Sequence, residues 1–167
     1  MMRPENELGG NLVMKCKYTI ETLIGELTVL ENDGRITDLH FGKVSILGMK
    51  EMKTELIEEV EKQINEYYQG KRQDYDLPLR LEGTPFQKKV WEALREIPKG
   101  ETRTYEDIAI AVGNPKASRA VGMANNRNRI PVIIPCHRVI GKNGKLVGYA
   151  GGLDVKARLL AMEKKRG

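Results

Sequence analysis

The strongest chemical signal in the chain is the run Ile134-Pro135-Cys136-His137-Arg138-Val139. A cysteine acts as a nucleophile only as its thiolate, and a neighbouring base or cation lowers the pKa of the thiol. His137 follows Cys136 directly, and Arg138 adds a positive charge. Neighbours in an extended segment point to opposite faces, so the pattern alone leaves open whether a tight turn or a bridging water connects the imidazole to the thiol.

A histidine that acts as a base needs an acceptor behind it, and Glu163 is the best candidate. It follows Leu159 and Leu160 by four and three positions on a predicted last helix, so we expect it to face inward, towards His137. A Cys-His pair by itself also occurs where the cysteine is an inert buried residue.

The charge of the 167 residues is divided unevenly along the chain. Residues 1–83 have a net charge of −5 and residues 84–167 one of +10. A basic half of this kind suits a polyanion such as nucleic acid, and the alternative is a solvated basic surface. With 40% hydrophobic and 31% charged residues the chain is typical of a soluble globular protein. We expect no membrane span, and for residues 1–10 a loose tail without a secretory signal.

The chain has two cysteines, Cys16 and Cys136, and two histidines, His40 and His137. This is not the composition of a disulfide scaffold, so we expect a reducing, cytoplasmic compartment. A four-ligand zinc site would use every cysteine and histidine, and the short ligand spacings are absent. We therefore expect no metal and no cofactor.

The first half is predicted to form a small sheet followed by a helix. Strands are expected at residues 13–20, 25–30 and 35–41, with a turn at Asn32-Asp33-Gly34. Apolar residues recur at i+4 and predict a helix over residues 50–68, which Gly70 ends. Residues 71–83 are predicted to be a linker.

The second half is predicted to be mainly helical. Thr84-Pro85-Phe86-Gln87 has the pattern of a capped helix start, and this helix should end near Ile97. Two short helices follow, one over residues 104–112 and one that Asn114 caps, with Pro115 first and its end near residue 125. This helix-turn-helix pattern is common in DNA-binding proteins, although helix pairs also occur in proteins that bind no DNA. Residues 129–134 should form a buried strand, and residues 153–164 the last helix.

The fold class that follows is α/β. A small N-terminal α/β domain, a three-stranded sheet plus a helix, should span residues 1–78. A mainly helical C-terminal domain with a winged-helix-like helix-turn-helix should span residues 79–167.

The second helix of the pair has small residues, among them Ala117, Ala120 and Gly122, where a helix that reads bases would have several long polar side chains. Small residues let a backbone approach closely, which favours a narrow groove and binding that ignores sequence. Tight packing between helices is the other interpretation.

Taken together, these motifs resemble the O6-alkylguanine-DNA alkyltransferases, also called methylated-DNA–protein-cysteine methyltransferases. The resemblance covers residues 84–165. Its motifs, each at family-like spacing, are Gly100-Glu101 with Tyr105, Gly113-Asn114-Pro115-Lys116-Ala117, Arg119-Ala120-Val121-Gly122, Asn128, Pro135-Cys136-His137-Arg138-Val139 and Tyr149-Ala150-Gly151-Gly152-Leu153. The first half is similar only in its length and element order.

The resemblance implies one reaction and a role for each matching residue. Cys136 takes an alkyl group irreversibly from O6 of guanine in double-stranded DNA, once per molecule. His137 acts through a water as the base, Glu163 holds His137, and Tyr105 serves the guanine N3. Asn128 bridges the helix pair to the active-site segment. The residues implied in binding DNA or the flipped guanine are Ser118, Arg119, Ala120, Gly122, Arg138, Val139, Tyr149, Ala150 and Gly151.

One position departs from the family pattern, because many members have serine where this chain has Ala150. We expect the loss of that hydroxyl to have a modest effect on the rate of transfer. The activation free energy should change by the contribution of one hydrogen bond, about 0.5–1.5 kcal/mol. We also expect the protein to act as a monomer.

Three alternatives differ in class from a repair transferase. A non-catalytic binder of alkylated DNA would have another residue in place of Cys136. A transcription regulator would have more base-reading side chains on the second helix of the pair. A cysteine hydrolase would turn over an ester without DNA.

Overall fold

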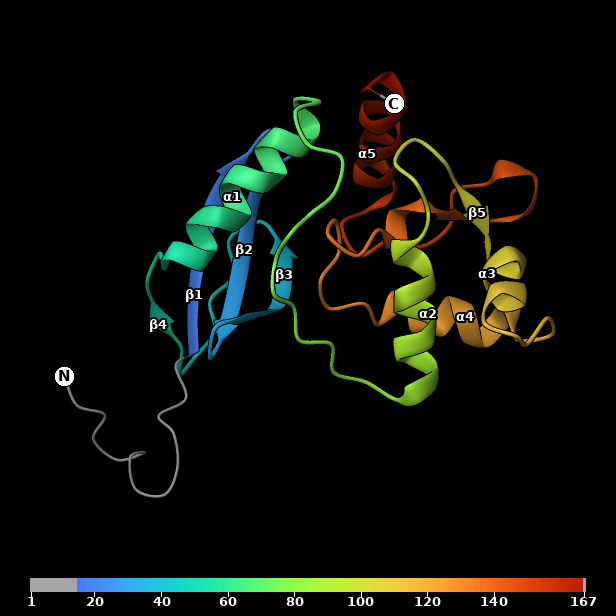
Figure 1. Ribbon diagram of the computed structural model, residues 1–167, viewed down its shortest axis with the longest axis horizontal. Coiled ribbons are helices and arrows are strands. Elements are labelled where there is room, and N and C mark those ends of the chain that lie inside the picture. The colour runs from blue at the N-terminus through green and yellow to red at the C-terminus, as the bar shows by residue number, and fades with distance from the viewer. Residues whose placement is uncertain (1–14, 167) are drawn as a thin grey trace.

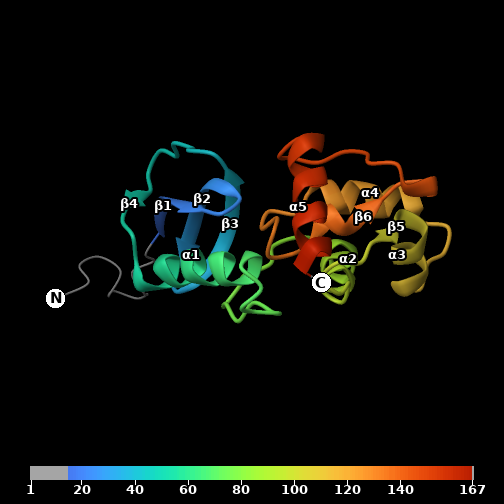
Figure 2. The same ribbon diagram turned by 90° about the horizontal axis from the view of Figure 1, so that it is seen from above.

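The structure, a computed structural model, describes residues 15–166. A small sheet with one helix lies at one end of the molecule and a group of helices at the other (Figure 1). The view from above shows the same division, with α5 on the side of the helical group that faces the sheet (Figure 2). The predicted tail at residues 1–10 lies outside the described residues, as do the first two residues of the first predicted strand.

The sheet has four strands in the order β3-β2-β1-β4. The predicted strands are confirmed as β1 (Lys15–Thr22), β2 (Gly25–Asn32) and β3 (Arg35–Phe41), which form an antiparallel meander. The short strand β4 (Lys50–Glu51), which was not predicted, lies parallel to β1.

Helix α1 (Glu55–Tyr68) begins later than residue 50, where the sequence placed its start. Thr54 caps it by accepting a hydrogen bond from the backbone N–H of Ile57, and Lys50 and Glu51 pair with β1 instead. The buried face of α1 includes Ile57, Val60 and Ile64, and its last turn buries two tyrosines, Tyr67 and Tyr68.

The outer edge of β3 is covered by other parts of the chain, which leaves fewer exposed backbone groups there. Ile36 donates to the carbonyl of Pro78 (2.8 Å), and Leu39 to that of Arg129 (2.8 Å). The Arg129 guanidinium also binds the carboxylate of Asp38 on β3 (2.9 Å). The segment that precedes Cys136 is therefore attached to the edge of the N-terminal sheet.

Four helices build the second half: α2 (Pro85–Arg95), α3 (Tyr105–Ala111), α4 (Ser118–Asn126) and α5 (Leu153–Arg166). Strands β5 (Arg103–Thr104) and β6 (Val139–Ile140) form a short parallel pair, and the 3₁₀ turns are η1 (Cys136–Arg138) and η2 (Lys142–Gly144). Both α2 and α3 begin with a capping box, the first at Thr84 and the second at Thr104. The predicted helix-turn-helix is α3 and α4.

Two local predictions in this half are wrong. Asn114 and Pro115 do not begin a helix: they form a turn, in which the N–H of Ala117 bonds the carbonyl of Asn114 (3.0 Å), and α4 begins at Ser118 without a side-chain cap. Residues 129–134 are not a strand, because Val132 has a positive φ of 77° that bends the chain. The apolar side chains of this segment reflect its burial, not strand pairing.

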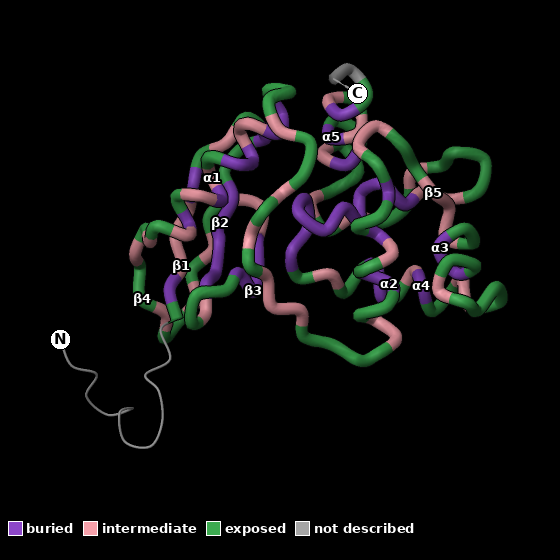
Figure 3. Tube along the Cα trace, in the orientation of Figure 1, coloured by how far each residue is buried: buried purple, intermediate pink, exposed green. Residues whose placement is uncertain are grey.

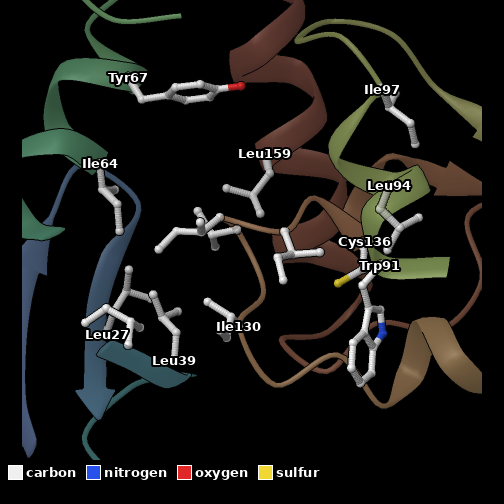
Figure 4. Close-up of a cluster of buried hydrophobic side chains, with 14 of the residues drawn as sticks. Leu27, Leu39, Ile64, Tyr67, Trp91, Leu94, Ile97, Ile130, Cys136 and Leu159 are labelled. Carbon is white, nitrogen blue, oxygen red and sulfur yellow. The ribbon is translucent and has the colours of Figure 1, made fainter. Parts of the chain in front are cut away.

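One cluster of buried apolar side chains runs through both halves. The buried residues follow the inner faces of the elements, while the loops outside are exposed (Figure 3). Figure 4 shows Leu27 and Leu39 of the sheet, Ile130 of the bent segment, and Leu94 and Leu159 of the helical half in one continuous region. Because the core is shared, a division at residues 78 and 79 stays a prediction. Between residues 15 and 166 no helix is long and apolar enough to cross a bilayer.

The capping box of α3 gives a test of local stability. Replacing Thr104 by alanine removes the oxygen that accepts a hydrogen bond from the N–H of Asp107 (3.0 Å). We therefore expect the free energy of unfolding, measured in urea, to fall by about 1 kcal/mol. Thr102→Ala is the matched control, since Thr102 is exposed and caps no helix. Equal losses in the two variants would contradict the role of the cap.

Candidate active site

The 3₁₀ turn η1 places Cys136, His137 and Arg138 in the interior of the protein. Cys136 is 5% exposed and belongs to the same cluster of buried side chains as Trp91 of α2 (Figure 4). Cys136 and Cys16 are both free thiols, and both are buried. The segment forms a tight turn here, which the sequence had left open.

Asn128 and the bend at Val132 shape the chain just before η1. Asn128 follows α4, donates from Nδ2 to the carbonyl of Ile134 (2.8 Å), and accepts from the N–H of Ile130 at Oδ1 (2.9 Å). A branched residue with a positive φ is strained and persists only where its surroundings fix it. Asn128 thus connects the end of α4 to the segment that leads to Cys136.

His137 and Glu163 form a buried hydrogen bond, with Nε2 2.7 Å from Oε2 and both side chains 0% exposed. Burial lowers the pKa of His137, although Glu163 opposes this change. The imidazole is therefore neutral at pH 7 and donates to the carboxylate from Nε2. Within residues 15–166, Nδ1 has no hydrogen-bond partner, so its lone pair remains available to take a proton.

Arg138 was predicted to bind DNA, and the structure corrects this. The residue is 5% exposed, and its guanidinium donates to Glu163 Oε1 (2.8 Å) and to the carbonyl of Ile97 (2.8 Å). It also hydrogen-bonds the hydroxyl of Tyr67. Burial opposes ionisation of Glu163, but the hydrogen bonds from His137 and Arg138 outweigh it and lower the pKa of Glu163 to about 2. Arg138 therefore keeps Glu163 ionised.

The Cys136 thiol is protonated at neutral pH, because burial raises its pKa to about 11. A hydrogen bond from Asn128 and the positive charge of Lys156 lower the pKa of Cys136 and so act against burial. The nucleophile is thus inert at rest, and its proton must be removed for it to react.

Lys156 is a residue of the site that the sequence analysis did not single out. Its side chain is buried, and Nζ donates to the carbonyls of Val147 (2.9 Å) and Gly148 (3.3 Å), which fixes the loop before Tyr149. A usable signal was present: Lys156, Leu159 and Glu163 recur at i, i+3 and i+7, on one face of a helix.

Tyr105 lies at the start of α3, between α4 and the loop that Lys156 holds. Its hydroxyl is 3.4 Å from the carbonyl of Val147, and a Cβ atom built on Gly122 would be 3.8 Å from its ring. Burial raises the pKa of Tyr105, and the charge of Cys136 adds to this effect. The phenol is half-buried and close enough to the thiol to share its electrostatic environment.

The loop at Tyr149 packs against both His137 and the N-terminal sheet. The Tyr149 ring meets the imidazole edge-on at 6.2 Å and the ring of Phe41 at 5.7 Å. A Cβ atom on Gly151 would come within 2.9 Å of Phe41, so only glycine fits there. Ala150 is exposed in a groove of about 390 Å³, which His40 and Asn128 also line. Val139, in β6, is fully buried.

The four α4 residues predicted to bind DNA are at least partly accessible. Arg119 and Ala120 are exposed, and Ser118 and Gly122 are half-buried. Two large apolar residues, Ile110 of α3 and Met123 of α4, are also exposed on the helix pair. The structure leaves this face of the pair free to contact a partner.

Fold and site together define a class of protein, in which a buried cysteine is followed directly by a histidine paired with a glutamate, in a half of the chain that contains a helix-turn-helix. Among the described residues, no group of three or more histidine, cysteine, aspartate or glutamate side chains is arranged to hold a metal ion. The free thiol of Cys136 and the buried hydrogen bond between His137 and Glu163 support transfer of a group to Cys136 by attack of sulfur.

Comparison with known proteins gives the family. Residues 14–81 match the model of the 6-O-methylguanine DNA methyltransferase ribonuclease-like domain, and residues 85–165 match that of the DNA binding domain. The constitutive methylated-DNA–protein-cysteine methyltransferase of Bacillus subtilis is 49% identical over 159 residues, which cover 90% of this chain and 96% of the relative. The chain belongs to the 6-O-methylguanine DNA methyltransferase family.

Other relatives agree. A methylated-DNA–protein-cysteine methyltransferase of Methanosarcina barkeri is 50% identical over 153 residues, covering 87% of this chain and 94% of the relative. The crystal structure of Mycobacterium tuberculosis OGT in complex with DNA has a TM-score of 0.83 at 43% identity, covering 90% of this chain and 94% of that one.

The pairing of Glu163 predicts a specific dependence of stability on pH. Glu163→Gln leaves the buried Arg138 without its carboxylate, so we expect the free energy of unfolding at pH 7 to fall by about 3–5 kcal/mol. The depressed pKa of Glu163 stabilises the parent above pH 4.5, and this contribution is lost as the pH falls towards 2. The variant has no such contribution. The difference in the free energy of unfolding between parent and variant should therefore become smaller as the pH falls through this range.

Urea unfolding of both proteins at pH 7 and pH 3 measures this difference. Glu82→Gln is the control, because Glu82 is half exposed and its pair with Arg129 lies at the surface, where such pairs contribute about 0–1 kcal/mol. A difference between Glu163→Gln and the parent that stays constant with pH would rule out this account of the pair.

Proposed function

We propose that this protein repairs DNA by transferring an alkyl group from O6 of guanine to Sγ of Cys136. The observation that carries the proposal is the buried hydrogen bond between His137 and Glu163 beside the free Cys136 thiol. The relatives named as methylated-DNA–protein-cysteine methyltransferases support the same reaction.

The proposed step is an in-line displacement. The bond from Sγ to the alkyl carbon forms while the bond from that carbon to O6 breaks, and the electron pair of the broken bond goes to guanine. The thiol proton passes through a water to Nδ1 of His137, which Glu163 orients from the other side of the ring. The Tyr105 hydroxyl donates to N3 of the leaving guanine.

We further propose that the target base leaves the duplex before it reacts, since its O6 cannot reach a buried thiol while stacked. Arg119, which is exposed on α4, would fill the space that the base vacates. The loop at Tyr149, together with Val139, would line the pocket for the flipped guanine.

Each molecule should act once, because water does not displace the thioether that forms on Cys136. We propose that the protein acts as a monomer in the cytoplasm, and its two free thiols support a reducing compartment. A non-catalytic role in binding alkylated DNA is the alternative, and the presence of Cys136 with its histidine and glutamate argues against it.

The direct test is the intact mass of the protein after incubation with a duplex that contains O6-methylguanine. We expect the mass to rise by one methyl group per chain and no more. Cys136→Ala should gain nothing, whereas Cys16→Ala, which removes the other buried thiol, should gain one methyl group. Retained DNA binding without any gain in mass would favour the non-catalytic alternative.

The role of Arg119 can be separated from the chemistry. Arg119→Ala should slow transfer from duplex DNA by about tenfold or more, because an unstacked base costs a few kcal/mol to hold out of the helix. Transfer from the free base O6-benzylguanine should not change, since no base has to be flipped. Arg35→Ala, on the exposed start of β3, is the control. An equal loss with both substrates would refute the proposed role.

A further inference from the structure

The carboxylate of Glu163 binds a third donor, which comes from the N-terminal half of the chain. The hydroxyl of Tyr68, in the last turn of α1, donates to Glu163 Oε2 at 2.7 Å, across 95 positions of sequence. Tyr68 is 2% exposed and Glu163 is 0% exposed, so water does not compete for this bond. The sequence pattern placed Tyr68 at the end of the apolar stripe of the predicted helix, but neither this pattern nor the resemblance assigned it to the site.

Tyr68 and His137 donate to the same oxygen. Both bond Oε2 at 2.7 Å, while Arg138 bonds Oε1. When two donors share one acceptor, each draws electron density that the other would use. The tyrosine hydroxyl therefore weakens the hold of Glu163 on His137 and also fixes the position of the carboxylate.

The end of α1 is rigid enough for such a role. Tyr67 packs edge-on against Tyr68 with ring centroids 5.3 Å apart, and stacks on Tyr75 at 4.5 Å. Its hydroxyl points towards α5 (Figure 4) and bonds Arg138, the partner of Glu163. Two neighbouring tyrosines of α1 thus contact both members of the buried ion pair.

We propose that Tyr68 is a positioning residue for alkyl transfer, through which the N-terminal half sets how readily His137 accepts the thiol proton. This inference rests on the proposed function, in which His137 is the base. It gives the α/β half a part in the reaction, beyond its contribution to the core.

The charged and titratable groups around His137 and Glu163 come from every neighbouring element. They are Cys136 and Arg138 on η1, Tyr67 on α1, Tyr75 in the linker, Tyr149 in its loop, and Lys156 on α5. None of them donates to Oε2, so removing the Tyr68 hydroxyl leaves His137 as the one donor to that oxygen among the described residues.

The test is the single-turnover transfer rate of Tyr68→Phe from O6-methylguanine duplex as a function of pH, normalised to folded protein by circular dichroism. Without the competing hydroxyl, Glu163 holds the imidazolium more strongly. We therefore expect the acid limb of the profile to move to higher pH by about half a unit to one unit, as for one hydrogen bond.

Tyr75→Phe is the matched control. It also removes a buried tyrosine hydroxyl near this cluster, but that hydroxyl has no hydrogen-bond partner within residues 15–166. Its profile should coincide with that of the parent. A purely structural effect would lower the rate of Tyr68→Phe equally at every pH.

The outcomes separate the two proposals. A Tyr68→Phe profile that keeps its acid limb in place, while the parent methylates Cys136 normally, overturns the role of Tyr68 alone. A parent protein that takes up no methyl group overturns the proposed function and this inference with it. A shifted limb in Tyr68→Phe and an unshifted one in Tyr75→Phe support both.

Discussion

The architecture depends on one buried charge, the carboxylate of Glu163. An ionised group without water is tolerated only when donors satisfy it, and breaking such a pair costs several kcal/mol. Here the donors come from His137 and Arg138 on the 3₁₀ turn and from Tyr68 on α1. Satisfying this one group therefore requires α5, the active-site turn and the N-terminal helix to meet in one place.

This requirement explains why the two halves share a core. Arg138 pairs with Glu163 on α5 and also donates to the hydroxyl of Tyr67 on α1 and to the carbonyl of Ile97, just after α2. It therefore connects three parts of the chain. The bent segment before Cys136 bonds the edge of β3, and Phe41 packs on Gly151 beside the Tyr149 loop. The N-terminal half therefore supports the thiol site on two sides, although the resemblance assigned it no role.

The parts of the structure that local rules control could be predicted from the sequence. Thr84 and Thr104 cap their helices because the capping box needs only residues three positions apart. The position of Glu163 could be predicted because helical spacing places it on the same face of the last helix as Leu159, the face that packs inward. Prediction failed where distant contacts decide: Val132 has a positive φ in a run that looks like a strand, and Arg138 turns inward because its acceptors lie far away in sequence. The contact of Tyr68 with Glu163 could not be predicted for the same reason, because 95 positions of sequence separate the two residues.

The central claim is that His137 is neutral, donates from Nε2 to Glu163, and keeps Nδ1 free to take the thiol proton. Nitrogen-15 NMR of histidine-labelled protein measures this directly, because the chain has only two histidines and His40→Gln assigns the spectrum. The account predicts a neutral His137 ring at pH 7 with its proton on Nε2. A ring that is doubly protonated at pH 7, or that has its proton on Nδ1, would contradict it.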